Sequence, residues 1–253
     1  MLGYFFTPER DLPANVGFAP LGKAHLLLLG ALGVGIAVFV RLACRMEVSR
    51  RLRLLRGVCV SMVVLELVKD LILALQGAFS VGYLPLHLCS MAMFICLFWA
   101  YRPAWDGAGQ CLYSLCLSGG VAALLFPDWS RMPLWHFQSL HSFVYHALLV
   151  AVPLIAVCSG MVRPGVSKVW KPMAFLLAAA VPVYGLDLLL GTNFMFLRYP
   201  VAGTPLELCA RCPGGYLLGF GLLAAAVLVL LNLPFSLWGQ WKRRKTRRKN
   251  GSI

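Results

Sequence analysis

The sequence is poor in charged residues, and above all in acidic ones. Only nine of its 253 residues are Asp or Glu, against 23 Lys and Arg, and charged residues make up 13% of the chain. Apolar residues make up 60%, and the mean hydropathy is +0.79. A soluble domain of this size cannot bury so much apolar surface, so the composition excludes an ordinary soluble protein and is typical of a chain embedded in lipid.

Several other signals are missing. The first 20 residues contain no basic start, no continuous apolar core and no small-residue cleavage site, so we expect no removable signal peptide. The chain has no tandem repeat and no Gly-rich phosphate loop. Six of the nine cysteines fall in or beside apolar runs without metal-like spacing, which is typical of packing residues. We therefore expect neither a metal ion nor another cofactor.

One pair of cysteines stands apart from the others. Cys209 and Cys212 form a CxxC motif in a predicted outer loop, where a disulfide is chemically possible. A zinc site would need two more ligands, which the neighbouring sequence does not supply. The sequence leaves the redox state of this pair open.

Long apolar runs, separated by charged residues and by Pro and Gly, predict an all-α transmembrane bundle of about seven helices. A helix that rises ~1.5 Å per residue needs roughly 20 residues to cross about 30 Å of hydrocarbon. The runs lie at residues 21–41, 57–79, 83–101, 108–126, 136–159, 170–190 and 214–237. Seven such spans leave no room for a soluble domain. We expect one transmembrane domain over residues 1–240 and a basic tail over residues 241–253.

The positions of the basic residues predict the orientation. If the spans alternate, loops 41–56, 102–107 and 160–171 and the tail together carry seventeen Lys and Arg, and the opposite side carries five. Cytoplasmic loops accumulate basic residues, so the N-terminus is expected outside and the tail in the cytoplasm of a multi-pass cell-membrane protein. The net charge of +14 then results from basic residues concentrated in the cytoplasmic loops and tail. It predicts anionic lipid headgroups as partners of the tail, and no nucleic acid.

The second predicted span contains three charged residues. Glu66, Lys69 and Asp70 are spaced i, i+3 and i+4, which places them on one helical face and lets Lys69 neutralise a carboxylate. Ionisable groups inside a membrane cost roughly 2.5–3.5 kcal/mol each on insertion scales, so they face protein or water and often mark function. Two interpretations stay open: an internally paired brace between helices, and part of a functional site.

Two residues with useful chemistry open the third predicted span, just inside the outer face. His87 and Cys89 lie two positions apart, and two residues on a helix differ by about 200°. They therefore point to nearly opposite sides of the helix. A base for Cys89 would have to come from another helix.

The fifth predicted span has polar side chains on two faces. One face carries Ser139, Ser142 and His146, spaced i, i+3 and i+7, and another carries Gln138, His141 and Tyr145. A single histidine in such a helix is more often a hydrogen-bonded packing residue than a catalytic one. Their density favours a functional role for one of them.

The polar residues share a depth in the predicted bundle. Asp187 lies within two turns of the outer end of the sixth span, and Asn193 follows in the next loop. With alternating topology, polar residues from four different spans lie in or beside the outer half of the bundle: Asp70, His87, Cys89, His141, Asp187 and Asn193. This shared depth predicts one pocket in the extracytoplasmic half of the bundle.

Three motifs carry a family resemblance: LPLHLCS at residues 84–90, FQSLHSFVYHALLV at 137–150 and GTNFMFLRYP at 191–200. In order and spacing they resemble the YwaF family of bacterial integral membrane proteins, over most of the chain from the second span onward. That group is distantly similar to a vertebrate transmembrane acyltransferase that remodels ether phospholipids, which in turn resembles the androgen-induced family of membrane lipid hydrolases. The resemblance implies that Cys89 is a nucleophile and His146 its base.

The sequence departs from the family pattern in one segment. Residues 206–216 read LELCARCPGGY, where the resemblance would place a Gly-x-x-Pro-x-Tyr segment. We therefore expect the outer loop after the third motif to be built differently.

The first functional hypothesis is a lipid acyltransferase or hydrolase, with membrane lipid as the partner. Cys89 would attack an acyl carbonyl, and His146 or His141 would accept and return the proton. Asn193 or His87 would donate to the oxyanion. Counted at ~1.5 Å per residue, Cys89 and His141 lie near one level and His146 lies roughly 7 Å deeper, so the sequence leaves the partner histidine open.

The second hypothesis is a transporter or small-ligand binding protein that uses the same cavity. Buried carboxylates, Lys69 and histidines suit proton-coupled transport. The sequence shows no inverted repeat and no clear pair of interrupted helices, which favours the lipid enzyme. The oligomeric state is not predicted.

Overall fold

The computed structural model describes the backbone of residues 2–250 and the side chains of residues 3–238, and this part of the chain is helical without strands. Six helical stretches are long and apolar enough to cross a membrane. They are built from α1 (Lys23–Arg45), η3 (Val81–Tyr83) with α3 (Leu88–Tyr101), α4 (Asp106–Cys111) with η4 (Leu112–Cys116) and α5 (Leu117–Leu125), α6 (Phe137–Cys158), η5 (Val166–Lys168) with α7 (Trp170–Leu190), and α9 (Tyr216–Asn250). Short helices are η1 (Leu2–Tyr4), η2 (Glu9–Asp11), η6 (Phe194–Phe196) and α8 (Leu206–Cys209). The expected all-α membrane architecture is confirmed.

The second predicted span is the long helix α2 (Val48–Leu75), which begins nine residues before the predicted start. The segment expected to be the loop 41–56 is therefore mostly helical. Arg51 lies in this added part of α2, and its guanidinium donates to the carbonyls of Ala43, Cys44 and Met46 at 2.7–2.9 Å. It closes the end of α1 from within the first turn of α2, and basic residues suit the carbonyl end of a helix.

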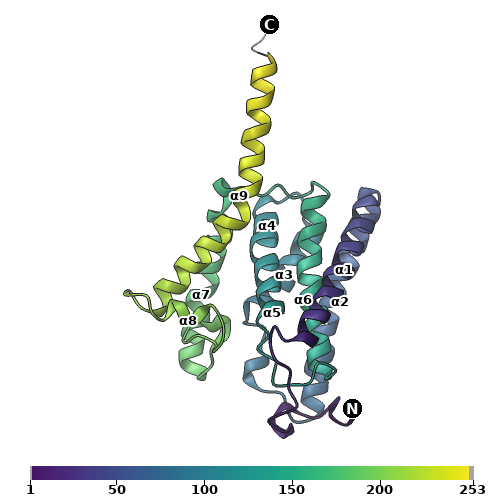
Figure 1. The fold of residues 1–253 in the computed structure, drawn as a ribbon, viewed down its shortest axis with the longest axis vertical. Coiled ribbons are helices and arrows are strands. Elements are labelled where there is room, and N and C mark those ends of the chain that lie inside the picture. The colour runs from purple at the N-terminus through teal and green to yellow at the C-terminus, as the bar shows by residue number, and fades with distance from the viewer. Residues whose placement is uncertain (1, 251–253) are drawn as a thin grey trace.

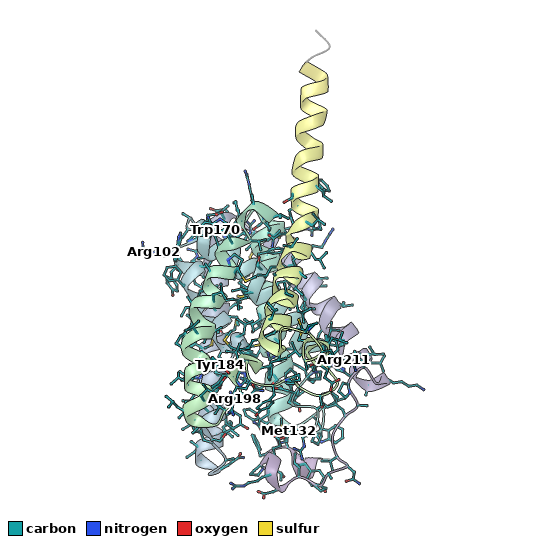
Figure 2. The ribbon with its side chains drawn as sticks, turned by 90° about the vertical axis from the view of Figure 1, so that its left-hand side faces the viewer. Arg102, Met132, Trp170, Tyr184, Arg198 and Arg211 are labelled. Carbon is teal, nitrogen blue, oxygen red and sulfur yellow. The ribbon has the colours of Figure 1, made fainter. Side chains whose placement is uncertain are left out.

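The connecting segments lie at two opposite ends of the bundle. Figure 2 shows Arg102 and Trp170 toward one end, and Met132 and Arg198 toward the other. The N-terminus lies at the second of these, here called the amino-terminal end, and α9 leaves the bundle at the opposite, carboxyl-terminal end (Figure 1). The labelled residues after α3, α5, α6 and α7 thus lie at alternate ends. The assignment of the carboxyl-terminal end to the cytoplasm remains a prediction from the basic residues, and the side chains of the tail, 241–253, lie outside those described.

The core lies between the α4–η4–α5 stretch and α6, which pack side by side. About two thirds of the residues in the apolar part of each are buried, whereas α1, α7 and α9 bury only a small share of theirs. Gly120 permits the close approach, because a Cβ at this position would lie 2.9 Å from Val150 Cγ2 and 3.2 Å from the His146 carbonyl oxygen. Small residues commonly allow membrane helices to approach in this way.

Candidate functional site

A buried ion cluster lies on the face of α2 that turns inward. Lys69 Nζ is 2.6 Å from Glu66 Oε1 and 3.2 Å from Asp70 Oδ1. Lys69 is only 9% exposed. The spacing of these residues predicted this arrangement, since positions i, i+3 and i+4 are neighbours on a helix. One ammonium group thus offsets two carboxylates inside the bundle.

Helix α6 and the short helix η3 complete the cluster. His141 Nε2 lies 3.6 Å from Glu66 Oε2. Lys69 Nζ lies 5.3 Å from the centre of the Tyr83 ring, within the range of a cation–π contact. Gln138 Nε2 donates to the Tyr83 hydroxyl at 3.1 Å. Three elements that are separate in the sequence therefore meet at one polar centre.

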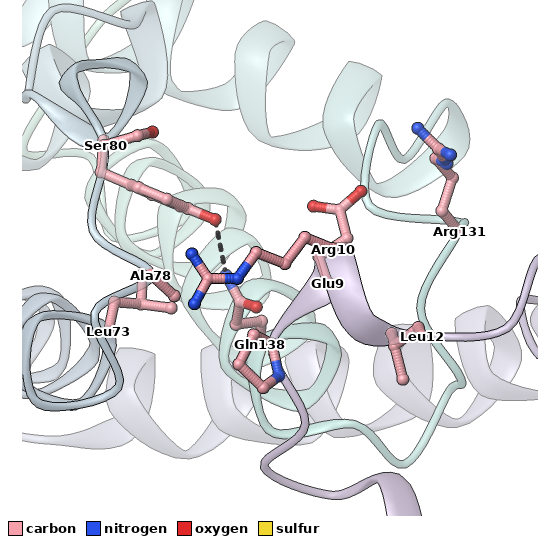
Figure 3. Close-up of a pocket in the computed structure, with 10 residues that line it drawn as sticks. Glu9, Arg10, Leu12, Leu73, Ala78, Ser80, Arg131 and Gln138 are labelled. Atoms are coloured by element: carbon pink, nitrogen blue, oxygen red, sulfur yellow. Dashed lines mark hydrogen bonds between the residues drawn. The ribbon is translucent and has the colours of Figure 1, made fainter.

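A polar pocket of about 360 Å³ opens above this cluster at the amino-terminal end. Figure 3 shows its Tyr83–Gln138 hydrogen bond and the Arg10 side chain extending into it from the N-terminal segment. Arg10 Nη1 donates to the Gly77 carbonyl at 3.2 Å, and His136 Nε2 lies 2.9 Å from the Thr7 carbonyl oxygen. The N-terminal segment is thereby held across the ends of α2 and α6. The lining residues are Pro8, Glu9, Arg10, Leu12, Leu73, Ala78, Ser80, Tyr83, Arg131 and Gln138.

Cys89, in the first turn of α3, is joined to α6 through Tyr145. The Tyr145 hydroxyl donates to the Cys89 carbonyl oxygen at 3.0 Å. The Tyr145 ring stacks on His141 with centroids 5.7 Å apart, and meets His146 edge-on at 5.4 Å. Among the described side chains, no hydrogen bond joins the half-buried Cys89 thiol to His146 or His141. The nucleophile candidate and both histidines are thus neighbours of one tyrosine.

His146 is held in one tautomer. Its Nδ1 lies 2.7 Å from the Ser142 carbonyl oxygen. A carbonyl oxygen only accepts, so Nδ1 carries the proton and Nε2 keeps a lone pair. The ring also stacks on Trp129, which precedes α6, at 5.1 Å and 16°. The imidazole is therefore oriented from both sides.

Asp187 and Asn193 shape the loop that follows α7. Asp187 Oδ1 accepts from the Thr192 hydroxyl and the Phe194 amide, both at 2.7 Å. Asn193 Oδ1 accepts from the Arg198 amide at 2.9 Å. These bonds hold a strained turn, because Met195 and Phe196 have φ of 53° and 58°. Such strain persists only where surrounding contacts fix the backbone.

His87 faces this loop rather than α6. Its ring meets Phe194 at 5.2 Å and Phe196 at 5.6 Å. His87 is the extended residue before α3, and Cys89, two residues later, accepts a hydrogen bond from Tyr145 through its backbone carbonyl. By their direct contacts, the polar residues expected in one pocket therefore form two groups. One group consists of Glu66, Lys69, Asp70, His141, His146 and Cys89. The other consists of Asp187, Asn193 and His87.

A comparison with known protein families matches residues 20–232 to the TMEM164 family, a family of transmembrane proteins. The chain belongs to the TMEM164 family. No curated protein and no solved structure matches the chain. For this TMEM164-family protein, multi-pass membrane insertion is supported by both the family and the six apolar helical stretches. The resemblance to the YwaF group stays a prediction.

Sequence reasoning missed part of the site of this TMEM164-family protein. It did find one part: helical spacing placed Gln138 and Tyr145 on the His141 face, and that face meets Glu66 and Cys89. No periodicity indicated Trp129 or the N-terminal segment, which reach the site from irregular connections. In this structure Cys209 and Cys212 are free thiols. Among the described residues, no three His, Cys, Asp or Glu side chains are grouped as a metal site.

Proposed function

We propose that this TMEM164-family protein is a membrane-embedded lipid acyltransferase or hydrolase, with Cys89 as the nucleophile and His146 as its base. The observation that supports it most is the fixed tautomer of His146, whose free Nε2 lone pair can take a proton. Tyr145 packs between this imidazole and the backbone of Cys89. The resemblance of the Cys89 and His146 segments to those of the YwaF group, and through it to the ether-phospholipid acyltransferase, points to the same pair.

The proposed reaction has two balanced steps. His146 Nε2 takes the thiol proton of Cys89, and the thiolate attacks the carbonyl carbon of a lipid ester. The ester C–O bond breaks, a thioester forms on Cys89, and the lysolipid oxygen leaves with the proton from His146. In the second step the hydroxyl of an acceptor lysolipid, or water, gives its proton to His146 and attacks the thioester. The new ester or the free acid leaves, and the thiol is restored.

The resting geometry requires a rearrangement before the first step. The Cys89 thiol and His146 belong to neighbouring helices but share no hydrogen bond in the described structure. Catalytic hydrogen bonds often tighten only when substrate is bound. His141 is the alternative base, since its ring stacks on the same Tyr145 that meets His146 edge-on. Comparing variants of the two histidines distinguishes these roles.

The polar pocket suits the headgroup of the same lipid. It is lined by Tyr83 and Gln138, and the Tyr83 ring in turn contacts Lys69 of the ion cluster. It contains two arginines and one carboxylate: Arg10, Arg131 and Glu9. Guanidinium groups bind phosphate well, and the carboxylate complements an amine. In this proposal the amino-terminal end faces outward, the protein resides in the cell membrane, and the basic tail contacts anionic headgroups in the cytoplasmic leaflet.

A second candidate function is binding or transport of a small polar ligand. The observation that favours it is the buried Glu66–Lys69–Asp70 cluster, which is linked to a polar pocket through the Tyr83 ring. Intramembrane groups of this kind often line ion or proton pathways. Uptake by proteoliposomes that depends on Glu66, without acyl transfer, would favour this function over the lipid enzyme.

The test of the proposed function is an acyl-transfer assay with purified protein in bilayers. A phospholipid with a labelled acyl chain serves as donor, and lysophospholipid and water serve as acceptors. We expect transfer or hydrolysis in the native protein and in Cys44→Ser, a matched half-buried cysteine on α1. We expect none in Cys89→Ser, provided that its melting temperature is retained. Full activity of Cys89→Ser would overturn the assignment.

A further inference from the structure

A second cavity, about 750 Å³ in volume, lies between α3, α4 and α7 near the carboxyl-terminal end. Its volume is within the range of about 300–1,000 Å³ typical of ligand pockets. Its walls are apolar, with Met91, Ile95 and Phe98 on α3 and Phe175 on α7. We call this cavity the α3–α7 groove.

The α3–α7 groove is separate from the proposed catalytic centre. Met91, Ile95 and Phe98 are spaced i, i+4 and i+7, so they form one stripe along α3. Cys89 lies two residues before Met91, about 200° away around the helix, and its backbone meets α6. The groove therefore faces away from Cys89, and its occupant does not have to be the acyl donor.

The groove extends over about two thirds of the hydrocarbon depth of one bilayer leaflet. The stripe from Met91 to Phe98 covers roughly 10 Å along the helix axis, against about 15 Å for half of the hydrocarbon core. Trp105 and Trp170 line its other end. Figure 2 shows Trp170 close to the loops at the carboxyl-terminal end. Tryptophan concentrates at the boundary between lipid tails and headgroups. An acyl chain in this leaflet would lie along the stripe.

The mouth of the groove carries an excess of positive charge. Asp106 is 2.7 Å from Lys168 Nζ and 2.5 Å from Lys171 Nζ. Asp106 and Lys171 both line the groove. One carboxylate between two ammonium groups leaves a net positive charge beside the Trp105–Trp170 boundary. This charge complements an anionic phosphate at headgroup depth.

From this match of depth, apolar lining and charge, we propose that the α3–α7 groove binds an anionic glycerophospholipid of the bilayer. One acyl chain lies along Met91, Ile95 and Phe98, and the phosphate is bound by Lys168 and Lys171. The lipid fills the space between α3 and α7 and so holds α7, which packs on α4, in its place. This site is independent of the proposed acyl transfer.

Photolabelling tests this proposal. The full chain is placed in phosphatidylcholine nanodiscs that contain a trace of phosphatidylglycerol with a diazirine on one acyl chain, irradiated, digested and mapped by mass spectrometry. We expect adducts concentrated in residues 91–98 and 170–175. Labelling there should fall about fivefold in Lys168→Gln/Lys171→Gln and stay unchanged in Lys23→Gln, an exposed lysine at the other end.

A steric pair of variants provides a second readout. Met91→Trp places a larger side chain in the groove, whereas Leu177→Trp adds the same side chain to an outward position of α7 that is 60% exposed. Only Met91→Trp should reduce labelling. Adducts spread evenly over the lipid-facing helices, or label unaffected by the lysine and Met91 variants, would overturn the proposal. Protein-to-protein crosslinks across this face, which would show a second copy in the groove, would also overturn it.

Discussion

The hydroxyl of Tyr145 on α6 donates a 3.0 Å hydrogen bond to the backbone carbonyl of Cys89 on α3. The same ring stacks on His141 and meets His146 edge-on. Tyr145 therefore sets the distance between the thiol-bearing turn and both candidate bases. In the proposed enzyme it is a positioning residue, because it acts on the reacting groups through Cys89 and the histidines.

Removal of this hydroxyl should separate positioning from stability. Tyr145→Phe keeps the ring contacts and loses one buried hydrogen bond, which we expect to cost about 1 kcal/mol of unfolding free energy. Tyr113→Phe is a matched control, since its hydroxyl donates to the Leu231 carbonyl at 2.9 Å. Both variants should lose similar stability, but only Tyr145→Phe should change the rate at which Cys89 reacts with a lipid-soluble thiol reagent. Equal reaction rates in the two variants would contradict the positioning role.

The buried ion cluster should depend on Lys69 for stability. Lys69→Met leaves Glu66 and Asp70 without their cation, and breaking a buried pair by removing one partner costs about 3–5 kcal/mol. Denaturant unfolding in detergent measures this loss. The double variant Lys69→Met/Glu66→Gln should recover part of it, and Lys23→Met, at an exposed lysine, should be nearly neutral. A native-like stability of Lys69→Met would show that the cluster does not brace the helices.

The turn after α7 should depend on the hydrogen-bonding oxygen of Asp187 more than on its charge. Asp187→Ala removes the acceptor for the Thr192 hydroxyl and the Phe194 amide, and leaves a buried amide unsatisfied at a cost of about 1–3 kcal/mol. Asp187→Asn keeps an oxygen at the same place and should lose less. Thermal melting of the purified variants measures the difference. Equal losses would indicate that the negative charge itself is required.

The contact between α5 and α6 should be sensitive to one methyl group. Gly120→Ala would place a Cβ 2.9 Å from Val150 Cγ2, and overpacking of this kind costs about 1–3 kcal/mol. Gly30→Ala on α1 is the control, because a Cβ at Gly30 would meet no described atom of a neighbouring helix within 4 Å. It should be neutral or slightly stabilising, since Ala is the better helix former. Similar melting temperatures for the two variants would contradict tight packing at Gly120.

Helical periodicity and charge spacing predicted much of this fold. Each apolar run of the sequence overlaps a helix of the structure, and the i, i+3, i+4 spacing of Glu66, Lys69 and Asp70 predicted their contacts. These features depend on residues within one or two turns. Helix α2 extends nine residues before the predicted apolar span, into a basic segment where Arg51 binds the end of the preceding helix, an interaction that hydropathy does not reveal.

The sequence alone does not predict the division of the polar residues into two groups. Equal depth placed His87, Cys89 and Asp187 together, but depth does not specify direction. The His87 ring contacts Phe194, whereas the Cys89 carbonyl accepts a hydrogen bond from Tyr145. The pocket was also beyond sequence reasoning. Its N-terminal wall is fixed by contacts such as Arg10 to Gly77, which are 67 residues apart in the chain.

The most direct test of the proposed chemistry is a search for an acyl group on Cys89. Purified protein is incubated with the labelled phospholipid, stopped with acid, digested and analysed by mass spectrometry, with and without hydroxylamine. We predict a hydroxylamine-labile acyl adduct on the Cys89 peptide that forms far more slowly in His146→Ala. Acyl transfer that proceeds with no adduct on Cys89, or at an undiminished rate in Cys89→Ser, would contradict the proposed chemistry.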